Sequence, residues 1–342
     1  MIDSDVQYLR RAIRLAMNGR GRVEPNPMVG CVIVKDDRVI GEGFHAEFGG
    51  PHAEPAALEG CSESPAGATA YVTLEPCCHT DKKTPPCVPK LIAPFVARTV
   101  FQRPYITLKW AQSADGKVSS AGGARMQISN ATSTRVVHAL RSRSDAILVG
   151  VNTILSDDPM LTARGVERSQ LSLRIILDSQ LRTPLDSQLA RTANDLPVDL
   201  FFTRDGFISA DPQRIKQLMS TGINLIAADE TEDGRISIPK LLKRESFGEI
   251  THLLVEPGPR LAQSFFDAGA ADRVWVIQSE MRVDASDATA APTLPSRYVK
   301  TAEVNLDGDV LTEYLDRESD LFFVATESAD LALTGAAAGS LQ

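Results

Sequence analysis

Over the first hundred residues, hydrophobic positions recur with helical spacing in some segments and with strand-like spacing in others. From residue 4 to residue 18, apolar side chains recur every three or four positions, which predicts an amphipathic helix. Two apolar runs that follow are separated by Asp36-Asp37, a pair typical of a hairpin turn. The predicted elements, in chain order, are a helix over 4–18, strands over 29–34 and 39–43, a helix beginning over 52–58 and a strand over 70–74.

A second pattern begins at Arg103, where short apolar runs alternate with helical segments. Strands are predicted over 105–111, 146–151, 174–177, 198–202, 223–227, 253–255 and 274–277, with helices over 133–141 and 260–268. Strands that alternate with helices predict an α/β sheet. Beyond Glu280 this pattern fades. A polar loop is predicted over 284–295, and a disordered tail rich in small residues over 331–342.

Length and charge narrow the class of protein. A chain of 342 residues favours two domains, which we place at 1–101 and 102–330. The net charge of -8 argues against broad binding of nucleic acid or anionic membranes, although a local basic pocket for a phosphorylated small molecule is compatible with it. No apolar run could span a membrane and the first twenty residues contain no signal-peptide core, so we expect a cytoplasmic protein.

The five cysteines all lie between residues 31 and 87, which favours a metal site over a disulfide framework. His52 opens a predicted helix, Cys77 follows Glu75-Pro76 after a strand, and Cys87 comes after a proline pair. One imidazole and two thiolates suit tetrahedral zinc with the fourth position left to water. Glu54, two residues after the histidine, is placed to transfer protons, and the whole pattern is a zinc-deaminase signature.

Simpler explanations exist for each residue taken alone. His52 could be an ordinary surface histidine, and buried free cysteines are common. The joint pattern favours zinc, with Cys77 preferred to its neighbour Cys78 because it directly follows the Glu-Pro pair. Cys31 and Cys61 are expected to be packing residues.

Several motifs resemble the bifunctional riboflavin-biosynthesis deaminase/reductase family. They are Pro25-Asn26-Pro27-Met28-Val29-Gly30, Gly43-Phe44-His45, Pro51-His52-Ala53-Glu54, Thr73-Leu74-Glu75-Pro76-Cys77 and Lys83-Thr84-Pro85-Pro86-Cys87. The resemblance implies deamination of a pyrimidine that bears a phosphoribosylamino group, followed by reduction of the ribose to ribityl with NADPH. It also implies that Asn26, His45, His79 and Lys83 contact this substrate.

The resemblance continues through the second domain, in segments such as Ser113-Ala114-Asp115-Gly116-Lys117 and Leu254-Val255-Glu256-Pro257-Gly258-Pro259. It implies a dihydrofolate-reductase-like fold. Gly258 lies between a strand that ends at Val255 and the helix that follows, in a turn that can hold a dinucleotide phosphate. Substrate contacts are expected from Lys109, Arg141, Met160, Arg164 and Glu256, and NADPH contacts from Ala111, Gln127, Thr153, Asp157, Gly258, Pro259 and Arg260.

The chain departs from the family after the segment Val96-Ala97-Arg98, which runs almost directly into the second domain. We therefore expect an α/β protein with a shortened cytidine-deaminase-like domain at its N-terminus and a dihydrofolate-reductase-like domain after it. The missing sheet edge should be covered by the reductase domain or by a second subunit of a homodimer. One alternative is a reductase whose deaminase domain is degenerate and structural. Another is a non-catalytic zinc scaffold, against which Glu54 argues, because a structural site needs no such carboxylate.

Overall fold

The computed structural model describes residues 3–24, 26–48, 50–65, 68–73, 93–94, 97–98, 101–123, 126–166, 171–319 and 321. These residues belong to two compact units that divide between Val96 and Ala97. No helix in the described ranges has the length and apolar character needed to cross a membrane.

The first unit is built on an antiparallel sheet of three described strands in the order β2-β1-β3. The strands are β1 (Gly30–Lys35), β2 (Arg38–Phe44) and β3 (Thr69–Val72), and the helices are α1 (Asp3–Ala16), the 3-10 helix η1 (Met17–Gly19) and α2 (Ala53–Glu59). Asp36 and Asp37 both have positive φ, as a tight β-hairpin turn requires. The predicted hairpin and the predicted helices are therefore confirmed.

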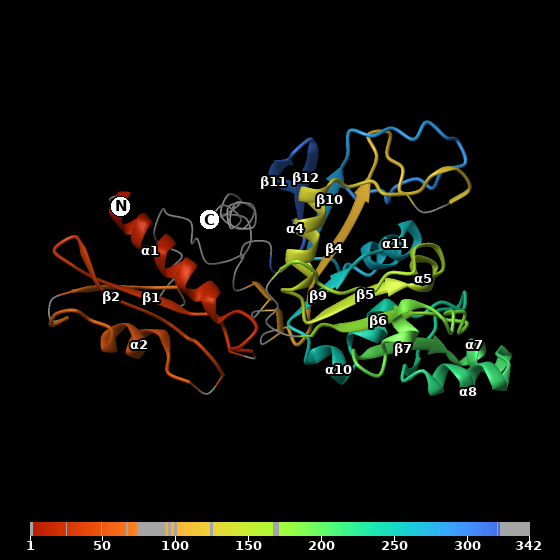
Figure 1. Ribbon diagram of the computed structural model, residues 1–342, viewed down its shortest axis with the longest axis horizontal. Helices are drawn as coiled ribbons and strands as arrows, with labels where there is room; N and C mark the ends of the chain where they lie inside the picture. Colours follow the sequence, from red (N-terminus) through yellow and green to blue (C-terminus); the bar gives the residue numbers. More distant parts are fainter. Residues whose placement is uncertain are drawn as a thin grey trace. The chain divides into compact units, whose positions relative to one another are not determined.

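The two helices cover opposite faces of β1 (Figure 1). Val32 and Val34 pack toward Ala12 of α1, whereas Cys31 and Ile33 pack toward Ala53 and Ala57 of α2. Cys61 packs against this second cluster, so the packing role expected for Cys31 and Cys61 is confirmed.

Glycines let α2 lie directly on the sheet. A Cβ at Gly43 would collide with the backbone nitrogen of Ala57 and the carbonyl oxygen of Ala53, and one at Gly41 would collide with the carbonyl oxygen of Ala57. At Gly43 the strand meets the helix backbone directly, and at Gly41 the Cys61 sulfur lies beside the helix backbone. The beginning of α2, which carries His52 and Glu54, is consequently held by backbone contact.

The second unit contains a nine-stranded sheet in the order β11-β12-β10-β4-β9-β5-β6-β7-β8. Its strands are β4 (Tyr105–Gln112), β5 (Ala146–Gly150), β6 (Leu173–Leu177), β7 (Val198–Thr203), β8 (Asn224–Ala228), β9 (His252–Val255), β10 (Arg273–Gln278), β11 (Tyr298–Leu306) and β12 (Asp309–Asp316). Neighbours from β10 to β8 are parallel, whereas β12 is antiparallel to both β10 and β11. The predicted strands of this domain are all present.

Helices cover both faces of the large sheet. The described helices of this unit are the 3-10 helix η2 (Ala121–Gly123), which lies in a loop, and α4 (Ala131–Arg141), α5 (Val151–Asp157), α6 (Gln188–Arg191), α7 (Arg204–Ser209), α8 (Pro212–Ser220), α9 (Ile238–Leu242), α10 (Glu245–Gly248) and α11 (Pro259–Asp267). Val136, Val137 and Leu140 of α4 belong to one core, and Phe265 and Phe266 of α11 belong to the core on the other face. The result is a helix–sheet–helix sandwich, as the alternating pattern predicts.

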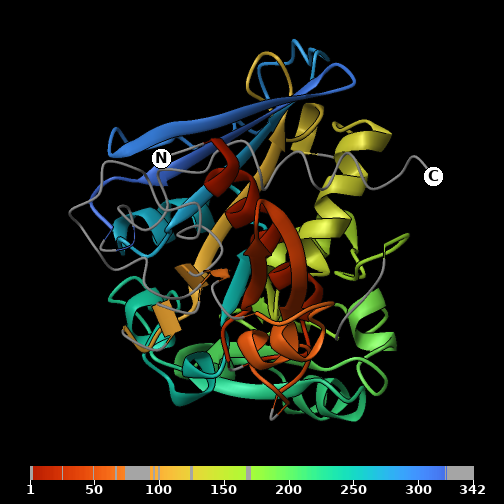
Figure 2. The same ribbon diagram turned by 90° about the vertical axis from the view of Figure 1, so that its left-hand side faces the viewer.

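The hairpin of β11 and β12 was not predicted. It extends the sheet beyond β10 and appears in blue along one edge in Figure 2. Its turn, Asp307-Gly308, has positive φ at both residues, and an Asp-Gly pair between apolar runs is a strong hairpin signal. The polar loop expected over 284–295 is confirmed, since the structure has neither helix nor strand there apart from an isolated bridge at Ala290.

Candidate active sites

The first candidate site lies at the beginning of α2. His52 is extended and forms the N-cap of this helix, and its carbonyl oxygen accepts a hydrogen bond from the backbone nitrogen of Ala56. The His52 side chain is exposed, whereas Glu54 in the first turn is half-buried. An exposed imidazole followed two residues later by a carboxylate has the chemistry of a catalytic zinc site with a proton-transfer group beside it.

His45 connects this helix start to Asn26. Its Nδ1 lies 2.8 Å from the carbonyl oxygen of Pro51, and its Nε2 lies 3.2 Å from Nδ2 of Asn26. Because a carbonyl can only accept, Nδ1 must donate, which leaves Nε2 to accept from the Asn26 amide. The ring centroid of His45 is 5.7 Å from that of His52. The structure thus brings together Asn26, His45 and His52, three residues expected in one site.

The other residues expected at this site fall outside the described residues. They are Cys77, His79, Lys83 and Cys87. Within the described ranges, no group of three His, Cys, Asp or Glu residues could hold a metal ion, which agrees with the absence of two expected ligands from those ranges.

The second candidate site is a cavity of about 1150 Å³ at the carboxyl ends of the parallel strands. It is bordered by the second half of β4, the ends of β5 and β6, and the residues after β9. Ligands in open α/β sheets bind at such edges, where the strand order changes direction. All the substrate and cofactor residues expected in this domain line it: Lys109, Ala111, Gln127, Arg141, Thr153, Asp157, Met160, Arg164, Glu256, Gly258, Pro259 and Arg260.

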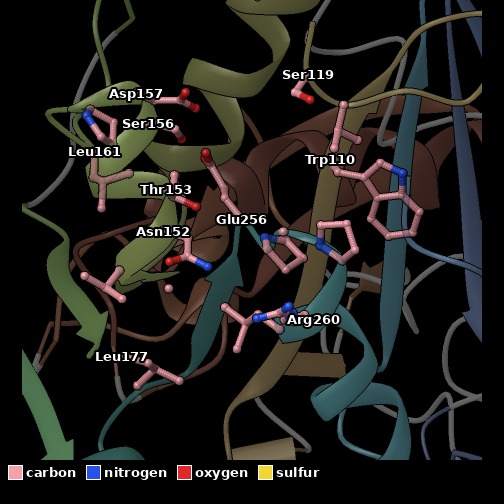
Figure 3. A pocket seen from close by; sticks show the side chains of 18 of the residues that line it. Trp110, Ser119, Asn152, Thr153, Ser156, Asp157, Leu161, Leu177, Glu256 and Arg260 are labelled. Atoms are coloured by element: carbon pink, nitrogen blue, oxygen red, sulfur yellow. The ribbon is translucent and has the colours of Figure 1, made fainter. Parts of the chain in front are cut away.

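A buried ion pair lies in this cavity. Both carboxylate oxygens of Glu256 accept from the Arg141 guanidinium, at 2.6 and 2.7 Å. Burial alone would raise the pKa of Glu256, but the hydrogen bonds and charge of Arg141, with Lys109, lower it to about 2. Figure 3 shows Glu256 near the centre of the cavity, with Thr153 and Asp157 on one side of it and Arg260 below. Arg141 is thus committed to Glu256 in this structure, although it was expected to face substrate.

Lys109 provides a second positive charge in the same cavity. Burial lowers the pKa of Lys109, while the nearby Glu256 carboxylate acts in the opposite direction. An amine with a lowered pKa gives up its proton to a bound substrate more readily than an ordinary lysine does.

His138 is a cavity residue that the sequence analysis did not single out. It is 8% exposed, and its Nδ1 lies 3.2 Å from both the backbone nitrogen of Arg164 and the carbonyl oxygen of Thr162. Burial, together with the charges of Arg141 and Arg164, lowers the pKa of His138. The sequence could have indicated His138, because it lies three residues before Arg141 and therefore on the same face of the helix.

Gly258 occupies the N-cap of α11, with Pro259 in the first turn. Its φ is -74°, which any residue adopts, and a Cβ there would meet nothing within 4 Å. The protein itself does not require glycine at this position. The open space is the cavity, so a side chain at residue 258 would occupy room beside the free N–H groups of the helix.

The two folds and their sites define a zinc-type deaminase joined to a dihydrofolate-reductase-like reductase. The family described as the cytidine and deoxycytidylate deaminase zinc-binding region matches residues 2–103, and the family described as the RibD C-terminal domain matches residues 104–281. The chain belongs to the RibD family of riboflavin-biosynthesis proteins, bifunctional enzymes with deaminase and reductase activities that use zinc and NADPH.

Similar proteins span both domains. The riboflavin biosynthesis protein RibD of Actinobacillus pleuropneumoniae is 36% identical over 317 residues, which cover 79% of this chain and 82% of the relative. RibD of Escherichia coli is 32% identical over 85% of this chain and 91% of its own. The structure of Acinetobacter baumannii RibD superposes with a TM-score of 0.70 at 27% identity, covering 91% of this chain and 98% of that chain.

A further similar structure carries a more specific description. It is a diaminohydroxyphosphoribosylaminopyrimidine deaminase/5-amino-6-(5-phosphoribosylamino)uracil reductase from Thermotoga maritima. Its TM-score is 0.70 at 27% identity, and the match covers 92% of this chain and 99% of that chain.

Proposed function

We propose that this protein deaminates a phosphoribosylamino-pyrimidine in its first domain and reduces the ribosyl group of the product to ribityl in its second. The observation that carries the proposal is the cavity of the second unit, which gathers every substrate and cofactor residue expected there. The description of the Thermotoga maritima relative supports the same pair of reactions. We place the two domains at 1–101 and 102–330, followed by a tail over 331–342.

For deamination, we propose that His52, Cys77 and Cys87 hold zinc and that Glu54 transfers protons. When bound, zinc makes water nucleophilic at neutral pH. Glu54 takes a proton from the attacking water and passes it to the departing amine, so that water and the amino group become a carbonyl and ammonia. Asn26, His45, His79 and Lys83 bind the base and its phosphoribosyl arm. The bonded chain from Pro51 through His45 to Asn26 would orient this amide.

For reduction, NADPH supplies the hydride that adds to the ribosyl carbon. The bond between that carbon and the ring oxygen breaks before or as the hydride adds, and the departing oxygen takes a proton, which we assign to Lys109. We propose that Arg141, Met160, Arg164 and Glu256 position the substrate around it. The proposed NADPH contacts are Ala111, Gln127, Thr153, Asp157, Gly258, Pro259 and Arg260, where the first turn of α11 provides N–H groups for a phosphate.

We also infer that the protein is a cytoplasmic homodimer that binds neither nucleic acid nor membrane. The net charge of -8 supports the second part, and dimers are common among domains of this reductase type.

The decisive experiment incubates the purified protein with the phosphoribosylaminopyrimidine, with and without NADPH, and measures ammonia release and NADPH oxidation separately. Both reactions are expected, with deamination independent of NADPH. Reduction of deaminated substrate supplied in a separate incubation, without any ammonia release from the original substrate, would instead support a reductase with a structural deaminase domain. If neither the substrate nor NADPH is consumed, the proposal is refuted.

A further inference from the structure

Two loops beyond the sheet are joined into one structure, here called the double loop. It comprises residues 113–123, which follow β4, and residues 281–291, which follow β10. Figure 1 shows these yellow and blue segments projecting together past the ends of the two strands. The hydrogen bonds between them are Ala114 N to Met281 O (2.7 Å), Val118 N to Thr289 O (2.9 Å), Ala291 N to Gly116 O (2.8 Å), Thr289 N to Ser119 Oγ (2.9 Å) and Gly122 N to Asp287 Oδ2 (2.9 Å).

Asp115 joins the two loops at their base. Its carboxylate accepts from the Ser113 hydroxyl at 2.8 Å and from the backbone nitrogens of Val283 and Asp284 at 2.9 and 3.0 Å. The Val283 and Ser113 hydrogen bonds are the main reasons why the pKa of Asp115 is lowered. The side chain is therefore an anion at neutral pH that accepts donors from both segments.

The double loop forms part of the wall of the reductase cavity. Val118, Ser119 and Gly123 line the cavity from the first segment, and Thr289 lines it from the second. Figure 3 shows Ser119 on the side of the cavity away from Leu177. Ser119 is only 8% exposed and its Oγ accepts from Thr289, whereas the Thr289 side chain itself is exposed toward solvent.

The position of the double loop indicates which ligand it faces. Its first segment connects Ala111, two residues before Ser113, to Gln127, four residues after Gly123. Both of these residues line the cavity and are proposed NADPH contacts. Thr289 lies beyond residue 281, where the match to the RibD C-terminal domain ends, so that match assigns it no role.

We propose that Thr289 is an NADPH-binding residue and that Asp115 is a positioning residue that acts through it. The hydrogen bonds between the two loops hold Thr289 in the cavity wall. Asp115 fixes the start of the second segment, which contains Thr289, through its hydrogen bonds to Val283 and Asp284. This inference rests on the proposed function, because it requires the cavity to take NADPH.

The test measures NADPH affinity by fluorescence titration of the full-length protein. Thr289→Val removes the hydroxyl and keeps the shape, and Asp115→Asn replaces one acceptor oxygen with a donor that faces a backbone N–H. Each is expected to weaken NADPH binding about five- to tenfold, the effect of one lost hydrogen bond. Asp284→Asn is the matched control. Asp284 lies in the same loop, and within the described part of the chain its side chain pairs with the exposed Arg282, so affinity should stay unchanged.

The double variant distinguishes positioning from independent action. If Asp115 acts through Thr289, combining Asp115→Asn with Thr289→Val should weaken binding by much less than the product of the two single effects. A multiplicative result would overturn the positioning role. Wild-type affinity in the Thr289→Val variant, while the wild type itself binds NADPH, would overturn the inference alone. No binding by the wild type would refute the proposed function as well. Thr289 is exposed, so this variant remains a test even if Asp115→Asn fails to fold.

Discussion

At the scale of single residues, the chemistry of both sites depends on which partner each charged group meets. Arg141 and Glu256 are far apart in sequence, yet they form a bidentate pair that is 12% and 15% exposed. The sequence indicated both residues as site residues but not that they bind one another. Their pairing orients Glu256 and leaves Lys109 as the other cation beside it.

Glu54→Gln should retain zinc and lose deamination. The amide keeps the size of the side chain but cannot accept and return a proton, so the rate should fall by at least ~10²–10⁴, the usual contribution of general acid–base catalysis. Zinc content by elemental analysis and ammonia release measure the two effects. Reduction of the deaminated substrate serves as the internal control. Near-normal ammonia release would remove Glu54 from the mechanism.

Glu256→Gln should destabilise the protein in a pH-dependent way. Because the pKa of Glu256 is about 2 in the folded state, below its ordinary 4.5, the charged pair contributes stability above about pH 4.5 that is lost as pH falls toward 2. Removing the carboxylate leaves Arg141 buried without its partner, which costs roughly 3–5 kcal/mol. Denaturant unfolding of both proteins should be measured from pH 3 to 8 in steps of about one pH unit. The difference in unfolding free energy between them should be constant above about pH 5 and should shrink in acid. If the difference in unfolding free energy grew in acid, the assigned role of the ion pair would be contradicted.

At the scale of elements, the proposed zinc site depends on how closely α2 lies on β2. Two glycines of β2 face the backbone of this helix, so the sheet and not a side-chain layer determines where His52 begins the helix. In the second unit the corresponding constraint is the parallel sheet, whose strand ends bring β4, β5 and β9 to one cavity.

Gly43→Ala should displace α2 and weaken zinc binding. The added methyl group would overlap the backbone of Ala53 and Ala57, and overpacking of this kind typically costs about 1–3 kcal/mol. The matched control is Gly60→Ala at the C-cap of the same helix, where a Cβ would make ordinary contacts at 3.4 Å or more and φ is -80°. Zinc retention against a chelator and thermal unfolding should separate the two variants. Equal retention would show that α2 can shift without moving the ligand.

At the scale of the whole molecule, two units with separate sites lie on one chain. The described sheet of the first unit has β2 and β3 as its outer strands. From the sequence we expect the connection between the two units to be shorter than in the family, with a substrate-binding loop missing.

Deamination should therefore be the slower of the two reactions. Losing two or three substrate contacts at about 1–1.5 kcal/mol each would weaken binding about 30- to 2,000-fold. Steady-state kcat/KM values for ammonia release and NADPH oxidation, measured on the same preparation, test this comparison. A deaminase value at or above the reductase value would mean that other parts of the chain replace the missing loop.

Local spacing in the sequence predicted the strands up to β10, the His52–Glu54 helix start and the two-domain organisation, but not the β11–β12 hairpin. These features depend on neighbours a few residues apart, where periodicity and turn chemistry act directly. Only the tertiary structure decided that β9 enters between β4 and β5, although it follows β8 in the chain. Strand partners are chosen by packing among distant segments, which no local pattern specifies. The position of β9 places Glu256 against Arg141. The pairing of β10 with β4 brings Thr289, in the loop after β10, to the cavity wall.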